Sequence, residues 1–429
     1  MRIDSLLQSA SKPVAKTLTR ALEGARLTEE ETLPLFAATG ADLRALTAAA
    51  DLVRKEVVGD DVTYVINRNI NFTNVCIKNC KFCAFSRELR SEQGYFLPAS
   101  EIIARAKQAQ KYGATELCLQ AGLAPSVDGR IYIDLTEKLR EAVPEIHFHA
   151  YSPEEVKYGA KRSKVSYEAY LRDLKAAGLG SLPGTSAEIL DDELRDEISP
   201  ARITTDEWVE IVTTAHRLGI PTTATMMFGH KETLEQRVAH MALIRSIQQD
   251  TGGFTEFVPL SFVHEESPLF NMDEQGGVRP GPTGNDVLRL YAIARLFLGR
   301  DIPNLQASWV KEGARFGQIL LDAGVNDLGG TLMNESISTT AGAKNGQLMT
   351  PAELRRVIRD AGRTPVQRDT LYRTVQRFDD PAQDPDEALN HVGDIDATFG
   401  SYATLAVDES IRYAWEPQRQ RANASSSGA

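Results

Sequence analysis

Three cysteines within eight residues are the clearest chemical feature of this 429-residue chain. Cys76, Cys80 and Cys83 follow the spacing CxxxCxxC, and no histidine lies between them. Three thiolates at this spacing can hold one iron–sulfur cluster while its fourth iron keeps no protein ligand. The spacing therefore predicts a 4Fe-4S cluster with one iron open to a small molecule.

A zinc module is the competing interpretation of these cysteines. A structural zinc site needs four protein ligands, and the one remaining cysteine, Cys118, stands alone in the apolar run Leu117-Cys118-Leu119. We expect Cys118 to be a buried, unreactive thiol. A non-catalytic iron–sulfur protein stays open as a second alternative, although electron carriers normally fill every iron position with protein ligands.

The elements around the cysteines predict a (β/α)8 barrel of the TIM type, because apolar runs alternate with amphipathic helical patterns about eight times. The expected strands are 62–73, 115–122, 145–152, 180–188, 222–229, 256–263, 304–310 and 327–333. The expected helices are 99–113, 131–143, 166–178, 204–219, 233–251, 284–299, 312–324 and 350–362. The cysteine loop follows the first strand, at the face where barrel active sites form. An open doubly wound sheet is the alternative, and the absence of a GxGxxG turn after that strand disfavours it.

The remaining segments divide around this barrel. Residues 1–60 are expected to form an N-terminal helical cap, and residues 61–365 are expected to form the barrel. Residues 366–415 are expected to form a C-terminal helical extension. Residues 416–429 are polar and rich in Ser and Ala, which predicts a disordered tail.

Charge and hydropathy exclude two classes of partner. The chain has 48 Lys and Arg against 59 Asp and Glu, a net charge of −11, which disfavours nucleic-acid binding because such binding depends on basic surfaces. The N-terminus lacks the apolar core of a signal peptide, and no apolar run approaches the length of a membrane span. We expect a cytoplasmic protein with no membrane segment, where clustered cysteines bind metal rather than form disulfides.

The cysteine loop, with Phe82 before its third cysteine, resembles that of the radical S-adenosylmethionine (SAM) superfamily. Longer stretches resemble one branch, the FO synthase subunit 2 type, which comprises the 4-hydroxyphenyl transferases of deazaflavin biosynthesis. The matching stretches are 71–87, 177–190, 220–230, 251–260 and 326–333. The resemblance therefore covers most of residues 62–345.

This resemblance implies two cofactors, a 4Fe-4S cluster and SAM. It also implies transfer of the 4-hydroxybenzyl group of L-tyrosine to 5-amino-6-(D-ribitylamino)uracil, after a 5′-deoxyadenosyl radical has abstracted hydrogen from tyrosine. Two partners are implied as well. One is an external electron donor, and the other is a ring-closing radical SAM FO synthase subunit that acts in the same pathway. One cysteine cluster indicates a stand-alone transferase rather than a fused synthase. A radical SAM enzyme of the futalosine route to menaquinone is the alternative within the superfamily.

Five residues are expected at the SAM site. Phe82 is adjacent to Cys83 in the loop and is expected near the adenine, as in radical SAM relatives. Gln120, Ala121 and Gly122 end the second strand, where many relatives carry Gly-Gly; the methyl group at Ala121 restricts how closely its backbone can approach a ligand. Glu188 ends the fourth strand and could bind the SAM ribose hydroxyls.

Three histidines are the candidates for substrate chemistry. His147 and His149 lie two apart in the third strand, so both face one side, which we expect to be the barrel interior. His149 is nearer the mouth and is the candidate of the pair. His230 ends the fifth strand, and His264 follows the sixth, where it suits recognition of a polar substrate. Trp309 is expected in the seventh strand, as a pocket-lining or packing residue.

Overall fold

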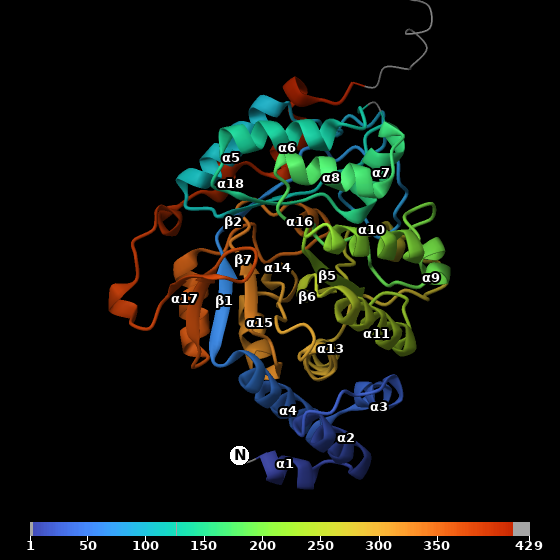
Figure 1. The fold of residues 1–429 in the computed structure, drawn as a ribbon, viewed down its shortest axis with the longest axis vertical. Coiled ribbons are helices and arrows are strands. Elements are labelled where there is room, and N and C mark those ends of the chain that lie inside the picture. Colours follow the sequence, from blue (N-terminus) through green and yellow to red (C-terminus); the bar gives the residue numbers. More distant parts are fainter. Residues whose placement is uncertain (1–2, 126, 415–429) are drawn as a thin grey trace, which may run out of the picture.

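Parallel strands form the inside of the molecule, and helices cover them (Figure 1). The structure is a computed structural model that describes residues 3–125 and 127–414. Its parallel strands are β1 (Asp61–Val65), β2 (Asn67–Ile70), β3 (Glu116–Leu119), β4 (His147–Ala150), β5 (Thr222–Phe228), β6 (Phe254–Ser261), β7 (Asp327–Gly330) and β8 (Thr364–Arg368). Most strand residues are buried, as expected where helices lie on a parallel sheet.

The strands form three sheets, in the orders β7-β1-β8-β9, β2-β3-β4 and β5-β6. Only Ile66 separates β1 from β2, so one extended segment contributes to two sheets. Isolated parallel bridges connect the sheets: His149 with Ser181, Leu182 with Thr222, Phe257 with Leu305, and Gln306 with Asp327. The order of the parallel strands follows the βα alternation predicted from the sequence.

Two of the predicted strands are wrong in extent. The segment 180–188 pairs only at Ser181 and Leu182, because Pro183 has no amide hydrogen and the next residue, Gly184, bonds to side chains of β5 instead of continuing a ladder. The segment 304–310 pairs only at two residues as well. Trp309 is not in a strand, since it begins helix α14 (Trp309–Glu312).

The predicted helices are present between the strands, each within a few residues of its expected ends. They are α5 (Ala99–Lys111), α6 (Ile131–Ala142), α8 (Tyr167–Ala177), α10 (Thr205–Arg217), α11 (Leu234–Thr251), α13 (Gly284–Leu298), α15 (Ala314–Leu320) and α17 (Pro351–Asp360). Thr204 and Glu207 form a capping box at the start of α10, and Gly178 ends α8 in a left-handed conformation. Local capping signals therefore fixed these boundaries.

Helix α7 (Pro153–Ser163) was not predicted. It starts directly after β4, where Ser152 and Glu155 form a capping box and Pro153 occupies the first turn. This Ser-Pro-Glu-Glu start is a recognisable helix signal. The shorter helices α9 (Asp192–Ile198), α12 (Pro268–Asn271) and α16 (Ile337–Thr340) were also not predicted.

Helices of the first sixty residues lie at one end of the molecule (Figure 1). They are α1 (Ile3–Ser9), α2 (Lys12–Leu22), α3 (Glu29–Thr32) and α4 (Gly40–Val58). Helix α4 packs against α13 and leads directly into β1. These helices therefore lie at the amino end of β1, away from the cysteine loop that follows β2.

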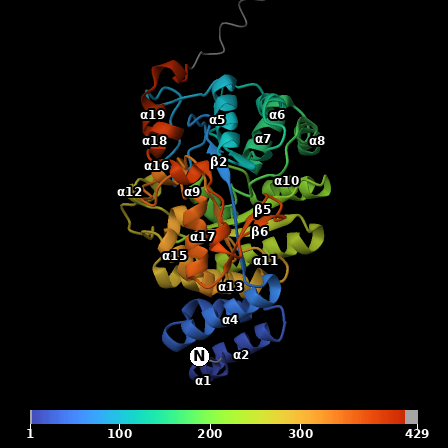
Figure 2. The ribbon, with the colours of Figure 1, turned by 90° about the vertical axis from the view of Figure 1, so that its left-hand side faces the viewer.

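The C-terminal segment begins as a strand and then returns to the cysteine loop. β8 pairs with β1, and β9 (Thr374–Arg377) pairs antiparallel with β8, so the expected helical extension begins with a hairpin. Helices α18 (Ile395–Phe399) and α19 (Tyr402–Val407) follow and lie beside α5 (Figure 2). The predicted tail 416–429 falls outside the described residues.

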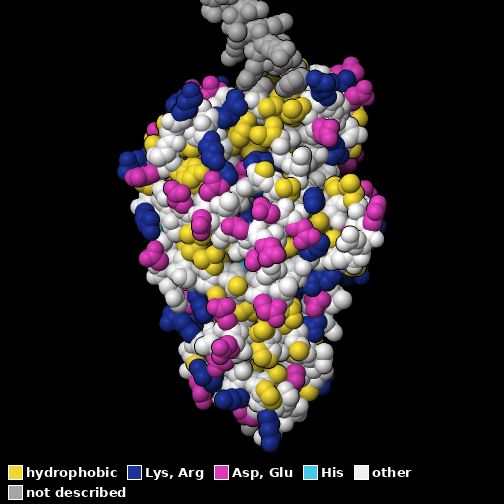
Figure 3. All heavy atoms as spheres, turned by 90° about the vertical axis from the view of Figure 1, so that its right-hand side faces the viewer, with side chains coloured by type: hydrophobic (Ala, Val, Ile, Leu, Met, Phe, Trp, Pro, Cys, Tyr) yellow, Lys and Arg dark blue, Asp and Glu magenta, His cyan; other side chains and the backbone are white. Residues whose placement is uncertain are grey.

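Surface features agree with a globular chain. Acidic and basic side chains are interspersed on the face shown in Figure 3. No helix among the described residues is both long enough and apolar enough to cross a membrane.

Gly184 gives a direct test of this packing. A Cβ atom there would lie 1.8 Å from the backbone oxygen of Thr223, which is fixed in β5. We expect Gly184→Ala to lower the free energy of unfolding by about 2 kcal/mol or more, because the backbones must separate. Urea unfolding followed by circular dichroism measures this change. Gly393→Ala is the matched control, since a Cβ atom there meets nothing within 4 Å; equal stability of the two variants would contradict the packing.

Candidate active site

The three cysteines lie on the long loop between β2 and α5, at the carboxyl end of β2. The loop has no regular element and is shaped by backbone hydrogen bonds. The Cys76 amide donates to Arg87 O at 3.1 Å, the Ile77 amide to Leu123 O at 3.0 Å, and the Cys83 amide to Cys80 O at 3.0 Å. The loop thus folds on itself and is attached to the end of the neighbouring strand segment.

Asn74 holds the base of this loop from within. Its side chain is fully buried; its Oδ1 accepts from the Tyr95 amide at 2.9 Å, and its Nδ2 donates to Gln93 O at 2.9 Å and to the Tyr402 hydroxyl at 3.2 Å. Tyr402 belongs to α19, so the C-terminal segment contributes to the loop's position.

The cysteines and the expected SAM residues line one cavity of about 230 Å³. All eight predicted cluster and cofactor residues are among its lining residues: Cys76, Cys80, Cys83, Phe82, Gln120, Ala121, Gly122 and Glu188. They come from the cysteine loop, the end of β3 and the segment after Leu182. The structure therefore brings together residues that are up to 112 positions apart.

Gly122 is the position in the Gln-Ala-Gly segment where no side chain fits. A Cβ atom there would lie 2.4 Å from the Val75 backbone oxygen, and the Gly122 amide donates to Thr73 O at 2.9 Å. The Ala121 amide donates to Glu155 Oε1 at 3.1 Å. Close backbone approach therefore occurs at Gly122 and joins the strand end to the cysteine loop, while Ala121 faces the cavity.

The three cysteines are half-buried. Burial raises the pKa of Cys76 and raises that of Cys80 to about 12, although the charge of Arg202 opposes the shift at Cys80. Iron would replace these protons, as metal binding does at thiols generally. In the described part of the chain, no three His, Cys, Asp or Glu side chains are close enough to share one metal ion. A 4Fe-4S cluster binds each thiolate through a different iron, and three cysteines that line one cavity suit such a cluster.

Glu188 reaches the cavity with two arginines beside it. Its Oε1 accepts from Arg202 Nη1 at 3.0 Å, and its Oε2 lies 3.5 Å from Arg195 Nη1. Arg195 is buried and also donates to backbone oxygens of the surrounding loop, including Ser186 O at 2.9 Å. Glu188 itself has a φ of 40°, a left-handed conformation that the loop must hold in place. The carboxylate is therefore rigidly placed at the cavity edge.

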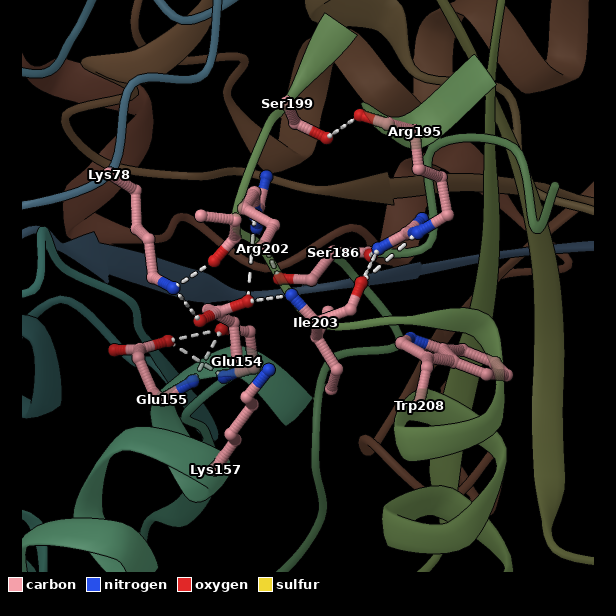
Figure 4. A network of polar contacts seen from close by, with 12 residues as sticks. Lys78, Glu154, Glu155, Lys157, Ser186, Arg195, Ser199, Arg202, Ile203 and Trp208 are labelled. Carbon is pink, nitrogen blue, oxygen red and sulfur yellow. Dashed lines mark hydrogen bonds and ion pairs between the residues drawn. The ribbon is translucent and has the colours of Figure 1, made fainter. Parts of the chain in front are cut away.

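Figure 4 shows a network of charged side chains that includes Lys78 of the cysteine loop. Glu154 is buried; its carboxylate accepts from the Ile203 amide at 2.6 Å and lies 3.2 Å from Lys78 Nζ of the cysteine loop. Arg202 Nε lies 3.8 Å from the same carboxylate. Burial alone would lower the pKa of Arg202, but Glu188, Cys80 and Glu154 raise it. Charged side chains thus connect the cysteine loop to α7 and to the segment before α10.

This network was not predicted from the sequence. No motif in the sequence singles out Lys78, Glu154, Arg195 or Arg202, and only folding brings them together. The capping box at Ser152 could have identified the helix that positions Glu154, but no local signal pairs Glu154 with Lys78 or Arg202.

Further cavities continue from the cysteines into the inside of the strands. One of about 160 Å³ shares Phe82, Cys83 and Glu188 with the first cavity. The next, of about 240 Å³, includes Trp309 and shares Thr185 and Gln120 with the first cavity. Trp309 donates its indole N–H to Gly330 O at 2.8 Å. Together the cavities provide room for ligands beside the cysteines.

His149 lies on the inner side of β4, as predicted, and lines an interior cavity of about 180 Å³. Its Nδ1 is 2.7 Å from the Ser181 hydroxyl, which also contacts His147 Nε2 at 2.8 Å. Burial lowers the pKa of His149 to about 4, against the charge of Glu116. The imidazole is therefore neutral at pH 7. In a regular strand Tyr151 would face the same side as His147 and His149, but its φ of 64° turns it toward Tyr132.

The structure does not bring His230 to the cavities described above. It is fully buried, with Nε2 3.0 Å from Met227 O and Nδ1 3.4 Å from Glu232 Oε2. Gly229, with a φ of 92°, changes the chain direction after β5, and this turn places the imidazole beside Phe262. Burial lowers the pKa of His230.

His264 lies at the edge of a further cavity of about 260 Å³, which Lys311 also lines. Its ring packs edge-on against Phe270, and its Nδ1 is 3.6 Å from Glu265. His264 therefore lies at the outer part of the cavity system, while His149 lies at the inner part.

Comparison with known protein families agrees with this geometry. Residues 70–244 match the family model described as Radical SAM superfamily. Residues 251–380 match the model described as CofH/MqnC C-terminal region. The first match contains all the cysteines that line the cavity.

A relative from Methanothermobacter thermautotrophicus, 5-amino-6-(D-ribitylamino)uracil--L-tyrosine 4-hydroxyphenyl transferase, is 50% identical over 350 residues, which span 82% of this chain and 95% of that protein. This chain belongs to the CofH family of radical SAM proteins. A CofH-family relative of the same name from Methanopyrus kandleri is 50% identical over 330 residues, 77% of this chain and 89% of that protein. FO synthase from Mycobacterium leprae is 47% identical over 345 residues, 80% of this chain and 40% of that protein.

Solved structures with the same fold are more distant in sequence from this CofH-family chain. The FeFe-hydrogenase maturase HydG from Carboxydothermus hydrogenoformans has a TM-score of 0.66 at 18% identity, over 86% of this chain and 83% of that one. Methylornithine synthase (PylB) has a TM-score of 0.60 at 18% identity, over 81% and 97% of the two chains. The CofH-family chain therefore has the radical SAM α/β fold.

Exchange of single cysteines tests the site. We expect Cys80→Ala, after anaerobic reconstitution, to lose most of the iron of the wild-type protein, which should hold about four iron atoms per chain, because only two thiolates remain. Iron analysis and the visible absorption of the cluster measure this. Cys118→Ala is the matched control, since Cys118 lies outside the cavity that the three cysteines line. Equal iron content of the two variants would contradict the assignment.

Proposed function

We propose that this chain transfers the 4-hydroxybenzyl group of L-tyrosine to 5-amino-6-(D-ribitylamino)uracil in deazaflavin (FO) biosynthesis. The observation that carries the proposal is the 50% identity to transferases of that name over nearly their whole length, combined with three cysteines around one cavity. The CofH/MqnC description names two proteins, so the C-terminal match alone does not choose between them. The relatives at about 50% identity favour the transferase over the futalosine route.

Cys76, Cys80 and Cys83 would hold a 4Fe-4S cluster in this function. When bound, the reduced cluster supplies the electron that cleaves SAM and so provides the hydrogen-abstracting radical. The residues of the chain have the tasks of binding and shielding. Gly122 allows close packing of the loop, Ala121 and Gln120 line the SAM side, Phe82 provides an apolar surface, and Glu188 accepts hydrogen bonds from a polar ligand.

The strands are proposed to form one closed (β/α)8 barrel with the cysteines at its mouth. The parallel bridges at Ser181, Leu182, Leu305 and Gln306 support this, because they lie between strands that would be neighbours in such a barrel. The proposed domains are the N-terminal helical cap 1–60, the barrel 61–365 and the C-terminal extension 366–415. A closed wall serves radical chemistry by keeping water from the reacting atoms.

Of the three candidate histidines, His149 and His264 are proposed to contact substrate. His149 is neutral and can donate or accept one hydrogen bond inside the barrel. His264 has a partly exposed imidazole at the outer cavity, which suits a polar group of the ribityl chain. His230 has no access to the cavities described above, so its proposed role is structural.

An external electron donor and a separate ring-closing radical SAM FO synthase subunit are the proposed partners. The four cysteines are free thiols, which fits a reducing compartment, and we place the protein in the cytoplasm. The proposal involves no nucleic acid and no membrane.

Anaerobic turnover tests the function. Reconstituted protein with SAM, a reductant, L-tyrosine and the ribitylaminouracil should form 5′-deoxyadenosine and a joined product, both at rates that depend on the two substrates, because the radical is generated only for the coupled reaction. Chromatography with mass spectrometry measures both species. Omission of each substrate in turn is the control. Turnover of aminofutalosine precursors in place of tyrosine would instead support the futalosine route.

A further inference from the structure

Lys311 occupies the junction of the cavity system. It lies in α14, and its side chain lines three adjoining cavities. It does not line the cavity that all three cysteines share. Lys311 is therefore placed to contact a ligand next to the proposed SAM site rather than SAM itself.

The ammonium group of Lys311 has no hydrogen bond or ion pair within residues 3–125 and 127–414. The nearby carboxylates have other partners. Glu312 accepts from the Ser261 hydroxyl, and both oxygens of Glu335 accept from the Ser338 amide, at 3.1 and 3.0 Å. Burial lowers the pKa of Lys311, while the charges of Glu335 and Glu312 oppose the shift. A half-buried cation that lines cavities and has no ion-pair partner is costly, so this position favours an anionic ligand.

The cavities on the two sides of Lys311 differ in chemistry. The cavity toward Cys83 is mainly apolar, with Phe82, Met227, Leu260 and Phe262 in its lining, and suits an aromatic ring. The cavity on the other side is lined by the amide side chains of Asn69, Asn71, Gln120 and Gln306.

Two of these amide side chains have an oxygen atom without a hydrogen-bond partner among the described residues. The Oδ1 atoms of Asn69 and Asn71 are buried without a hydrogen-bond partner among the described residues. Unpaired buried acceptors suit a neutral ligand that is rich in hydroxyl and N–H donors. This description fits a ribitylaminouracil, which carries no carboxylate.

We infer that Lys311 binds the α-carboxylate of the amino-acid substrate, with the phenol ring in the apolar cavity beside Cys83. This inference rests on the proposed function, in which tyrosine brings a carboxylate and the second substrate brings none. The carboxylate of SAM is accounted for separately, because the proposed SAM site is the cavity that Lys311 does not line. Lys311 thereby fixes the orientation of tyrosine, and the amide-lined cavity receives the acceptor.

Substitution of Lys311 combined with a change in the ligand tests the inference. With the anaerobic, cluster-containing protein, Lys311→Met should weaken L-tyrosine binding by about 10- to 100-fold, the loss expected for a buried charge-assisted pair. Tyramine, which lacks the carboxylate, should bind wild type and Lys311→Met within about twofold of each other. Lys311→Arg, which keeps the charge, should recover most of the loss. Equilibrium titration gives these affinities, and KM values for all three substrates give a second measurement.

Controls separate this inference from the proposed function. Lys138→Met, at an exposed position on α6, should leave tyrosine affinity unchanged. Iron content and the urea unfolding midpoint verify that Lys311→Met is folded; if it is not, Lys311→Gln, which also removes the charge, replaces it. The inference would be overturned if Lys311→Met bound tyrosine as tightly as wild type. It would also be overturned if the variant lost as much affinity for tyramine, or for SAM, as it lost for tyrosine. In each case, turnover by the wild-type protein would leave the proposed function intact. Absence of wild-type turnover would overturn the function and the ligand assignment together.

Discussion

The site depends on holding three thiols in one arrangement on a loop that contains no helix or strand of its own. Backbone amides supply part of the constraint, since residues of the loop bond to one another and to the segment after β3. The side chain of Asn74 supplies the rest by satisfying two backbone groups from inside the loop. Because such buried polar contacts are costly to break, the loop has few alternatives.

Charge extends this constraint around the cavity. Lys78 on the loop, Glu154 on α7, and Arg202 with Glu188 form a connected set of buried or half-buried ions. A buried ion pair adds little net stability, but loss of one member leaves the others unpaired. The network therefore contributes mainly to the position of the groups around the cysteines, and it adds a positive charge near thiols that a metal would convert to thiolates.

The sequence was sufficient for much of the fold, because its signals are local. Amphipathic patterns predicted α8, α10 and α11 close to their observed ends, and the cysteine spacing with strand-end segments predicted the residues that line the cavity. The predicted extent of the strand 180–188 is wrong partly for a nonlocal reason, since Gly184 bonds to threonine side chains of β5. His149 lies within a strand and lines the interior cavity, whereas the backbone turn at Gly229 carries His230 away from the cavities after its strand ends.

The bond between Tyr402 and Asn74 joins positions 328 residues apart. Phe399 adds to this junction, because its backbone oxygen accepts from Arg68 at 3.0 Å. During synthesis, the cysteine loop emerges from the ribosome long before these residues exist. It follows that the loop reaches its final arrangement only after the segment around Tyr402 has been synthesised, so cluster insertion into that arrangement must wait for this segment.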